Sequence, residues 1–202
     1  MKKANFEKVF SVFRSNYRLI PLKVFGNNPY KTLISTLLSS RTKDDLTLKV
    51  CNKLFIFAPN IFSLDQLGEL EIRNLIYPVG FYKTKAHQLP ILAKKILTDF
   101  GEKIPADREL LMTLPGVGRK TANLVLNRAF GIPAIAVDTH VHKICNLLGW
   151  VKTKTPEQTE KELVKILPKI YWTDINRLFV SIGRQYNTEK KLLNFLKKKF
   201  LI

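Results

Sequence analysis

The sequence is poor in several features that define common classes of protein. It has only two cysteines, Cys51 and Cys145, and each lies within an apolar helical pattern. This argues against a disulfide framework and predicts two buried thiols in a reducing compartment. No apolar run approaches the roughly 20 residues of a membrane span, and the N-terminus lacks a signal-peptide core. We therefore expect a cytoplasmic protein with no membrane partner.

Acidic residues are also scarce. The 202 residues include 34 Lys and Arg against 16 Asp and Glu, which gives a net charge of +18. Such an excess favours a polyanionic partner, although a generally lysine-rich proteome would produce the same composition. The length permits one or two small domains with a sizeable core.

The alternating pattern of β-strands is missing, and nearly every segment repeats its apolar residues with the helical period of 3.6. The sequence therefore predicts an all-α fold. Residues typical of helix starts precede these segments: Asn28 before Pro29, Thr42 or Asp44, Ser63 with Asp65, Asp107, Asp138 and Thr155.

Four further segments are expected to be helical. The first spans about residues 84–100, where Pro90 indicates either a kink or a later start. Another covers about residues 174–185. The tail after Thr188 has an apolar stripe at helical spacing, and so does the N-terminus; the two stripes comprise Leu192, Phe195, Leu196 and Phe200, and Phe6, Val9, Phe10 and Phe13.

The stretch from Leu111 to Ala122 predicts two helices joined by a tight hairpin. Pro115 fixes its own φ, while Gly116 and Gly118 allow conformations and close approaches that other residues resist. A glycine-rich turn that opens a helix presents backbone N–H groups to a phosphate. Lys120 falls in the first turn of that helix, where the dipole disfavours a cation, so it either contacts phosphate or is an amine made easier to deprotonate.

This hairpin, Leu114-Pro-Gly-Val-Gly-Arg-Lys-Thr-Ala122, together with Val137-Asp138-Thr139-His140, resembles the helix–hairpin–helix and Gly/Pro-rich loop with aspartate of the endonuclease III family of DNA glycosylases. The resemblance runs from about Tyr30 to Tyr186. It implies two helical subdomains with the active site in the cleft between them. A central domain would span 22–132, with the helix–hairpin–helix at about 108–130, and a second would combine 1–21 with 133–202.

The resemblance implies a bifunctional DNA glycosylase/AP lyase with Lys120 as nucleophile. The amine would displace the damaged base, form a Schiff base with the sugar, and permit strand cleavage by β-elimination. A helix N-terminus contributes only about 0.3–1 kcal/mol towards the neutral amine, so Arg119 and burial against DNA must supply the rest. Asp138, facing Lys120 across the cleft, would stabilise charge developing on the sugar. The plainer alternatives are a solvated lysine on a phosphate and a simple helix N-cap.

DNA contacts are expected at the hairpin and at two loops. Within the hairpin they would involve Gly116, Val117, Gly118, Arg119 and Thr121. The segments 39–44 and 80–86 resemble the family's wedge loops, and Arg41 and Phe81 would fill the gap left by the flipped nucleotide. Their alternatives are an ordinary exposed arginine and a core phenylalanine. His140 is expected to line the site.

No metal site of the protein's own is expected. His140 and His142 would lie about 200° apart around a helix, so they cannot easily share an ion. The resemblance implies that hairpin carbonyls can hold a monovalent cation. Many relatives bind a [4Fe–4S] cluster through four C-terminal cysteines, but no cysteine follows Gly183 here, so we predict no cluster. The tail helix would cap the core instead, and its basic face would touch DNA or be merely solvated.

The expected partner is duplex DNA with a damaged base or an abasic site, and the expected substrate is an oxidised pyrimidine. Preference for another lesion, such as oxidised guanine or a mismatched base, is the alternative within the enzyme class. A non-catalytic helix–hairpin–helix binding module is the alternative outside it. We expect a monomer associated with the nucleoid.

Overall fold

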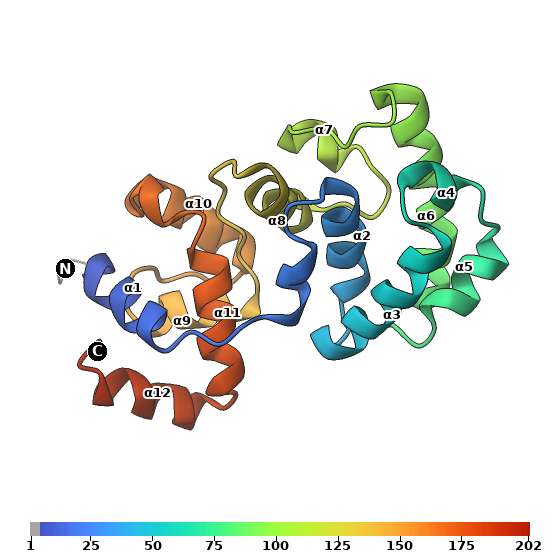
Figure 1. Cartoon of the computed structure of the whole chain (residues 1–202). Coiled ribbons are helices and arrows are strands. Elements are labelled where there is room, and N and C mark those ends of the chain that lie inside the picture. The colour runs from blue at the N-terminus through green and yellow to red at the C-terminus, as the bar shows by residue number, and fades with distance from the viewer. Residues whose placement is uncertain (1–4) are drawn as a thin grey trace. The chain divides into compact units, whose positions relative to one another are not determined.

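The structure, a computed structural model, describes residues 5–202. Within this range it contains twelve α-helices, two 3-10 helices and no strand, so the all-α prediction is confirmed (Figure 1). The chain divides into two compact units. One is Pro21–Ile132, and the other combines the N-terminal segment up to Ile20 with Pro133–Ile202.

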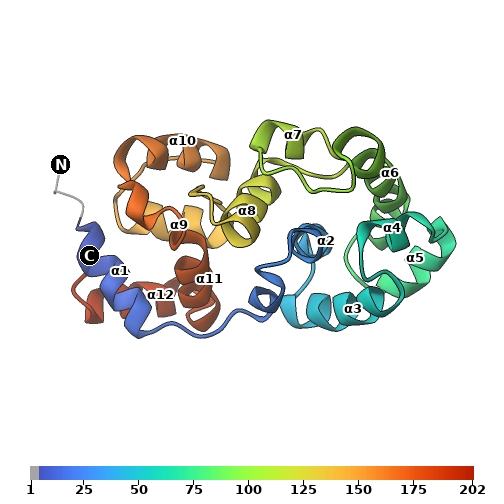
Figure 2. The ribbon, with the colours of Figure 1, turned by 45° about the horizontal axis from the view of Figure 1, so that its top comes forward.

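The unit Pro21–Ile132 is built around α2 (Pro29–Ser39), which Figure 2 shows end-on with α3, α6 and α8 around it. Every residue of α2 from Thr32 to Leu38 is buried, as expected for a central helix. The other elements of this unit are η1 (Pro21–Phe25), α3 (Asp44–Phe57), α4 (Ile61–Asp65), α5 (Glu69–Ile76), α6 (Tyr82–Phe100), α7 (Arg108–Met112) and α8 (Arg119–Phe130).

Side-chain caps fix the starts of α2, α4 and α7 in this unit. Asn28 and Asp107 each accept a hydrogen bond from the backbone N–H three residues on, which confirms two predicted caps. The predicted start at Ser63 is wrong. Asn60 caps α4 by accepting from the Ser63 N–H at 2.8 Å, so Ser63 already lies in the first turn.

Helix α6 begins earlier than its sequence indicates. It starts at Tyr82, directly after Phe81 in the left-handed conformation, and continues to Phe100. Pro90 therefore lies inside the helix, and the alternative of a late start is wrong. The proline is tolerated because its neighbours Ala86, Leu89 and Ala93 are packed into the core, which outweighs its local cost.

The second unit has α11 (Ile175–Gln185) running through its middle, with the other helices around it (Figure 1). Phe10 and Phe13 of the N-terminal helix are fully buried in its core, and the Phe10 ring stacks on Tyr171 with centroids 4.2 Å apart. The remaining elements are α1 (Phe6–Ser15), α9 (Thr139–Leu147), α10 (Pro156–Ile166), η2 (Lys169–Tyr171) and α12 (Glu189–Lys198).

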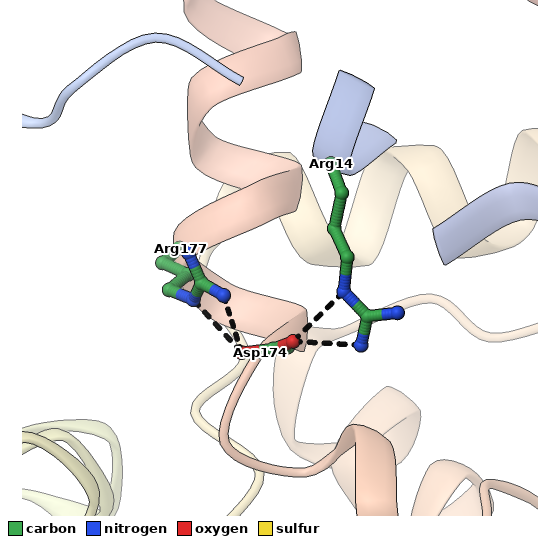
Figure 3. A network of polar contacts seen from close by, with 3 residues as sticks. All are labelled: Arg14, Asp174 and Arg177. Carbon is green, nitrogen blue, oxygen red and sulfur yellow. Dashed lines mark hydrogen bonds and ion pairs between the residues drawn. The ribbon is translucent and has the colours of Figure 1, made fainter. Parts of the chain in front are cut away.

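An ion-pair network joins α1 to the start of α11 (Figure 3). The Asp174 carboxylate accepts from Arg14 at 2.8 and 3.2 Å, and from Arg177 at 2.8 Å. Burial alone would raise the pKa of Asp174, but hydrogen bonds from the two guanidinium groups outweigh it and lower the pKa. The network therefore fixes the N-terminal helix on this unit in addition to its aromatic packing.

The C-terminal helix α12 packs on the same core. Leu192, Phe195 and Leu196 are buried, and the Phe195 ring stacks on Tyr186 with centroids 4.2 Å apart. Phe200 does not continue the predicted apolar stripe. It follows the end of the helix, has a φ of 54°, and is 81% exposed.

Candidate active site

The hairpin between α7 and α8 has the compact turn that its glycines predict. Gly116 has a φ of 76°, a conformation that favours glycine, and a Cβ there would lie 2.7 Å from the Gln88 side-chain oxygen, so the Gln88 side chain would have to move. Val117 is buried and its N–H donates to the Leu114 carbonyl at 3.1 Å. Val117 thus stabilises the turn itself.

The start of α8 has the geometry of an anion site. Gly118 is the N-cap with an ordinary φ of −91°, and a Cβ there would meet nothing within 4 Å. Its glycine is therefore not required by the fold, but it leaves the helix end open to a ligand. The first intrahelical donor is the Ala122 N–H, so the N–H groups before it point out of the helix end. Lys120 lies in this turn with an exposed side chain.

A cavity of about 190 Å³ lies beside the hairpin, entirely within the unit Pro21–Ile132. It brings together the end of α2, the start of α6 and the hairpin. The lining contains both polar and apolar residues. Its lining consists of Leu37, Leu38, Ser40, Phe81, Thr84, Lys85, Gln88, Leu89, Pro115, Gly116 and Thr121.

The two loops expected to act as wedges lie against each other. The Gly80 N–H donates to the Thr42 hydroxyl at 2.9 Å, and a Cβ on Gly80 would collide with the Arg41 carbonyl. Arg41 and Phe81 both adopt the left-handed conformation, with φ of 57° and 58°. Both side chains are exposed, and Phe81 is 66% accessible, so the alternative of a core phenylalanine is wrong.

Asp138 lies in the other unit, at the start of α9. Its Oδ1 accepts from the Val141 N–H at 2.9 Å, which confirms the predicted N-cap and fixes the carboxylate. Burial raises the pKa of the nearby Cys145 thiol, and the Asp138 carboxylate raises it further. Cys145 is therefore an inert neutral thiol in the core.

The side chains of His140 and His142, both on α9, lie in different surroundings. The His140 ring packs directly against Gly183 of α11, where a Cβ would overlap it. His142 Nδ1 lies 2.6 Å from the Thr159 hydroxyl, within a polar cluster that includes Asn146. His142 thus joins α9 to α10 as a packing residue. No group of three or more metal-binding side chains occurs among residues 5–202.

The two cysteines do not fit an iron–sulfur cluster. Cys51 is buried in the unit Pro21–Ile132 and Cys145 in the other unit, and the chain has no third thiol. Protein-bound iron–sulfur clusters of this type need four thiolate or equivalent ligands.

Between residues 5 and 202, no helix is both long and apolar enough to cross a bilayer.

Two candidate residues escaped the sequence reasoning. Gln88 packs its side-chain oxygen against Gly116, and Lys85 is buried at the edge of the same cavity. The position of Lys85 in the helical pattern could have indicated its unusual environment. It lies four residues before Leu89 on the apolar face of its helix, where a lysine is out of place.

Comparisons with known proteins agree on one class. A family model described as "HhH-GPD superfamily base excision DNA repair protein" matches residues 34–169, which is more than half of the chain. The hairpin and Asp138 both lie within the matched range. The fold and site therefore define a base excision repair enzyme of the helix–hairpin–helix class.

Individual relatives narrow this class. Endonuclease III of Thermotoga maritima is 45% identical over 158 residues, covering 78% of this chain and 74% of its own. Endonuclease III of Escherichia coli K12 is 34% identical, covering 91% and 87%. The solved "Structure of a non-covalent Endonuclease III-DNA Complex" superposes with a TM-score of 0.84 at 31% identity, covering 94% of this chain and 89% of that one. The chain belongs to the endonuclease III family of DNA glycosylases.

Proposed function

We propose that this glycosylase is bifunctional and removes oxidised pyrimidines from duplex DNA, then cleaves the strand as an AP lyase. The observation that carries the proposal is Lys120, an exposed amine in the first turn of α8 beside an open, glycine-capped helix end. A phosphate held by the helix N–H groups would bring the adjacent sugar to this amine. A related chain of 31% identity is described as a trapped endonuclease III–DNA covalent intermediate, which supports a covalent route.

In the proposed reaction the Lys120 Nζ lone pair attacks C1′ of the flipped nucleotide. The C1′–N bond breaks and the base leaves with its electron pair and a proton. The sugar ring opens to a Schiff base. Loss of a C2′ proton then expels the 3′ phosphate by β-elimination, and water hydrolyses the imine to regenerate the amine. None of these proposed steps changes an oxidation state that would require an added oxidant or reductant.

Asp138 is proposed to stabilise positive charge that develops on the sugar. A carboxylate can do this without moving if it is fixed beforehand. Its hydrogen bond from the Val141 N–H provides that preorganisation. The capping role and the catalytic role are therefore compatible, because the cap uses only one carboxylate oxygen.

Arg41 and Phe81 are proposed to enter the duplex where the nucleotide is extruded. A guanidinium plane and an aromatic ring can both stack between bases. Two exposed side chains on neighbouring backbone segments, both in a strained conformation, support this role. With a net charge of +18, the protein would also be attracted to the DNA backbone.

We further propose that the protein works without an iron–sulfur cluster. Only two thiols exist, and they are buried in separate units. The buried face of α12, formed by Leu192, Phe195 and Leu196, covers the core of its unit and would take over the stabilising role.

Borohydride trapping tests the chemistry. The protein is incubated with a duplex that contains thymine glycol, borohydride is added, and a covalent adduct is sought. We expect an adduct that is absent in Lys120→Ala and formed much more slowly in Asp138→Asn. An adduct with a plain abasic site but not with thymine glycol would support the AP lyase activity and contradict the proposal that oxidised pyrimidines are the substrate. Tight, salt-sensitive binding without any adduct would refute the covalent route.

A further inference from the structure

Lys85 is a buried lysine that the proposed chemistry does not use. It lies in the first turns of α6, is 9% exposed, and donates from Nζ to the carbonyls of Leu38 at 2.9 Å and Ser40 at 2.7 Å. These carbonyls belong to the end of α2, 47 and 45 residues earlier in the chain. The ammonium therefore satisfies acceptors that the helix end leaves without an intrahelical donor.

A buried ammonium is a costly way to satisfy two carbonyls. Burial lowers the pKa of Lys85 to about 8, an effect that the neighbouring Cys51 opposes. Because the pKa is lower in the folded state than in the unfolded state, the charged lysine reduces stability at neutral pH. The two carbonyls are therefore satisfied at some cost in stability.

The position of Lys85 points to a further role. Its Nζ bonds the carbonyl of Ser40, the residue directly before Arg41, and its backbone N–H donates to the carbonyl of Phe81 at 3.0 Å. The backbone bond is the first helical bond of α6, which any residue at this position would make. The contribution specific to lysine is the side chain, which ties the segment directly before Arg41 to the helix that begins directly after Phe81. Non-glycine residues adopt this conformation only where surrounding contacts impose it.

We propose that Lys85 is a positioning residue that locks the backbones of Arg41 and Phe81 into one rigid double wedge for the duplex. This inference rests on the proposed function of the two side chains. The Thr42 hydroxyl, which accepts from the Gly80 N–H, is the second tie between the loops. Without Lys85 the segment around Arg41 relaxes towards ordinary backbone conformations, and the two side chains no longer enter the stack together.

The test uses a DNA duplex with a tetrahydrofuran abasic analogue opposite 2-aminopurine. This analogue cannot react, so the fluorescence rise on binding reports only the unstacking of the opposite base by the wedge. Lys85→Met keeps the length and apolar stem of the side chain and removes the ammonium. Its matched control is Lys83→Met, which removes an exposed charge from the same turn of α6.

We expect Lys85→Met to lose most of the fluorescence rise while its affinity for DNA changes little, and Lys83→Met to retain the rise. Excision of thymine glycol should fall by about 10- to 100-fold, as for other misplaced site groups. In the double variant Lys85→Met/Phe81→Ala, the loss should be no greater than in Phe81→Ala, because both changes disable one device.

A full fluorescence rise in Lys85→Met would overturn the inference, and so would simple additivity with Phe81→Ala. If Lys85→Met folds poorly, Thr42→Val removes the second tie and must reduce the rise by itself. Failure of the proposed function gives a different pattern. In that case wild-type protein forms no borohydride adduct, whatever the fluorescence with the unreactive analogue.

Discussion

Replacing Leu196 with alanine tests whether α12 has become a structural part of its unit. The Leu196 side chain is fully buried on the core face of that helix. The change removes three carbons at about 0.8 kcal/mol each and leaves a cavity, so we expect a loss of about 3 kcal/mol. For a chain of this length, 1 kcal/mol shifts the melting temperature by about 2–4 °C, which predicts a decrease of about 6–12 °C.

The assay is thermal unfolding followed by circular dichroism, with Lys198→Ala as the matched variant. Lys198 lies on the exposed side of the same helix, where substitutions change stability by about 0.5 kcal/mol or less. Removal of residues 188–202 should destabilise the protein more than Leu196→Ala does, because it uncovers the whole apolar face. A melting temperature for Leu196→Ala within 2 °C of wild type would refute the idea that α12 caps the core.

Three further outcomes follow. The double variant Lys198→Gln/Lys199→Gln should reduce the salt dependence of DNA binding by up to about 1.8 in log–log slope if both residues contact phosphate, and an unchanged slope would assign this face to solvent. Gly183→Ala should lower the melting temperature, because the new methyl overlaps the His140 ring, whereas a rise would contradict that packing. Asp174→Asn should cost about 1–3 kcal/mol at pH 7. Since the pKa of Asp174 is lowered in the folded state, that difference should shrink as urea melts are taken below about pH 4.

Local signals in the sequence were sufficient for most helix starts and for the hairpin. Asn28, Asp107 and Asp138 cap their helices because a short polar side chain reaches the N–H three residues on, and this interaction needs no tertiary partner. The start at Ser63 failed because Asn60 offers a similar cap three residues earlier. The prediction that Phe200 continues the apolar stripe was wrong, because the periodicity does not show that α12 ends at Lys198.

The backbone conformation of the two loops could not be predicted from the sequence, for a different reason. Glycine is the usual sign of a left-handed residue, yet the positions that adopt this conformation are Arg41 and Phe81. Gly80, directly before Phe81 in the chain, is needed instead for its lack of a side chain against the Arg41 carbonyl. Tertiary contact determines the conformation here, so propensity at single positions could not predict it.

Lys85 shows how a mismatch in a pattern can be turned into a structural hypothesis. The helical period assigns it to the buried face of α6, and a lysine on such a face must either reach solvent or find acceptors. The sequence cannot distinguish these outcomes, because the acceptors are main-chain carbonyls of Leu38 and Ser40 and leave no trace in residue identity. Only the three-dimensional structure shows that the buried Lys85 donates to the carbonyls at the end of α2. Because these contacts lie next to the two left-handed positions Arg41 and Phe81, they suggest a function for the lysine.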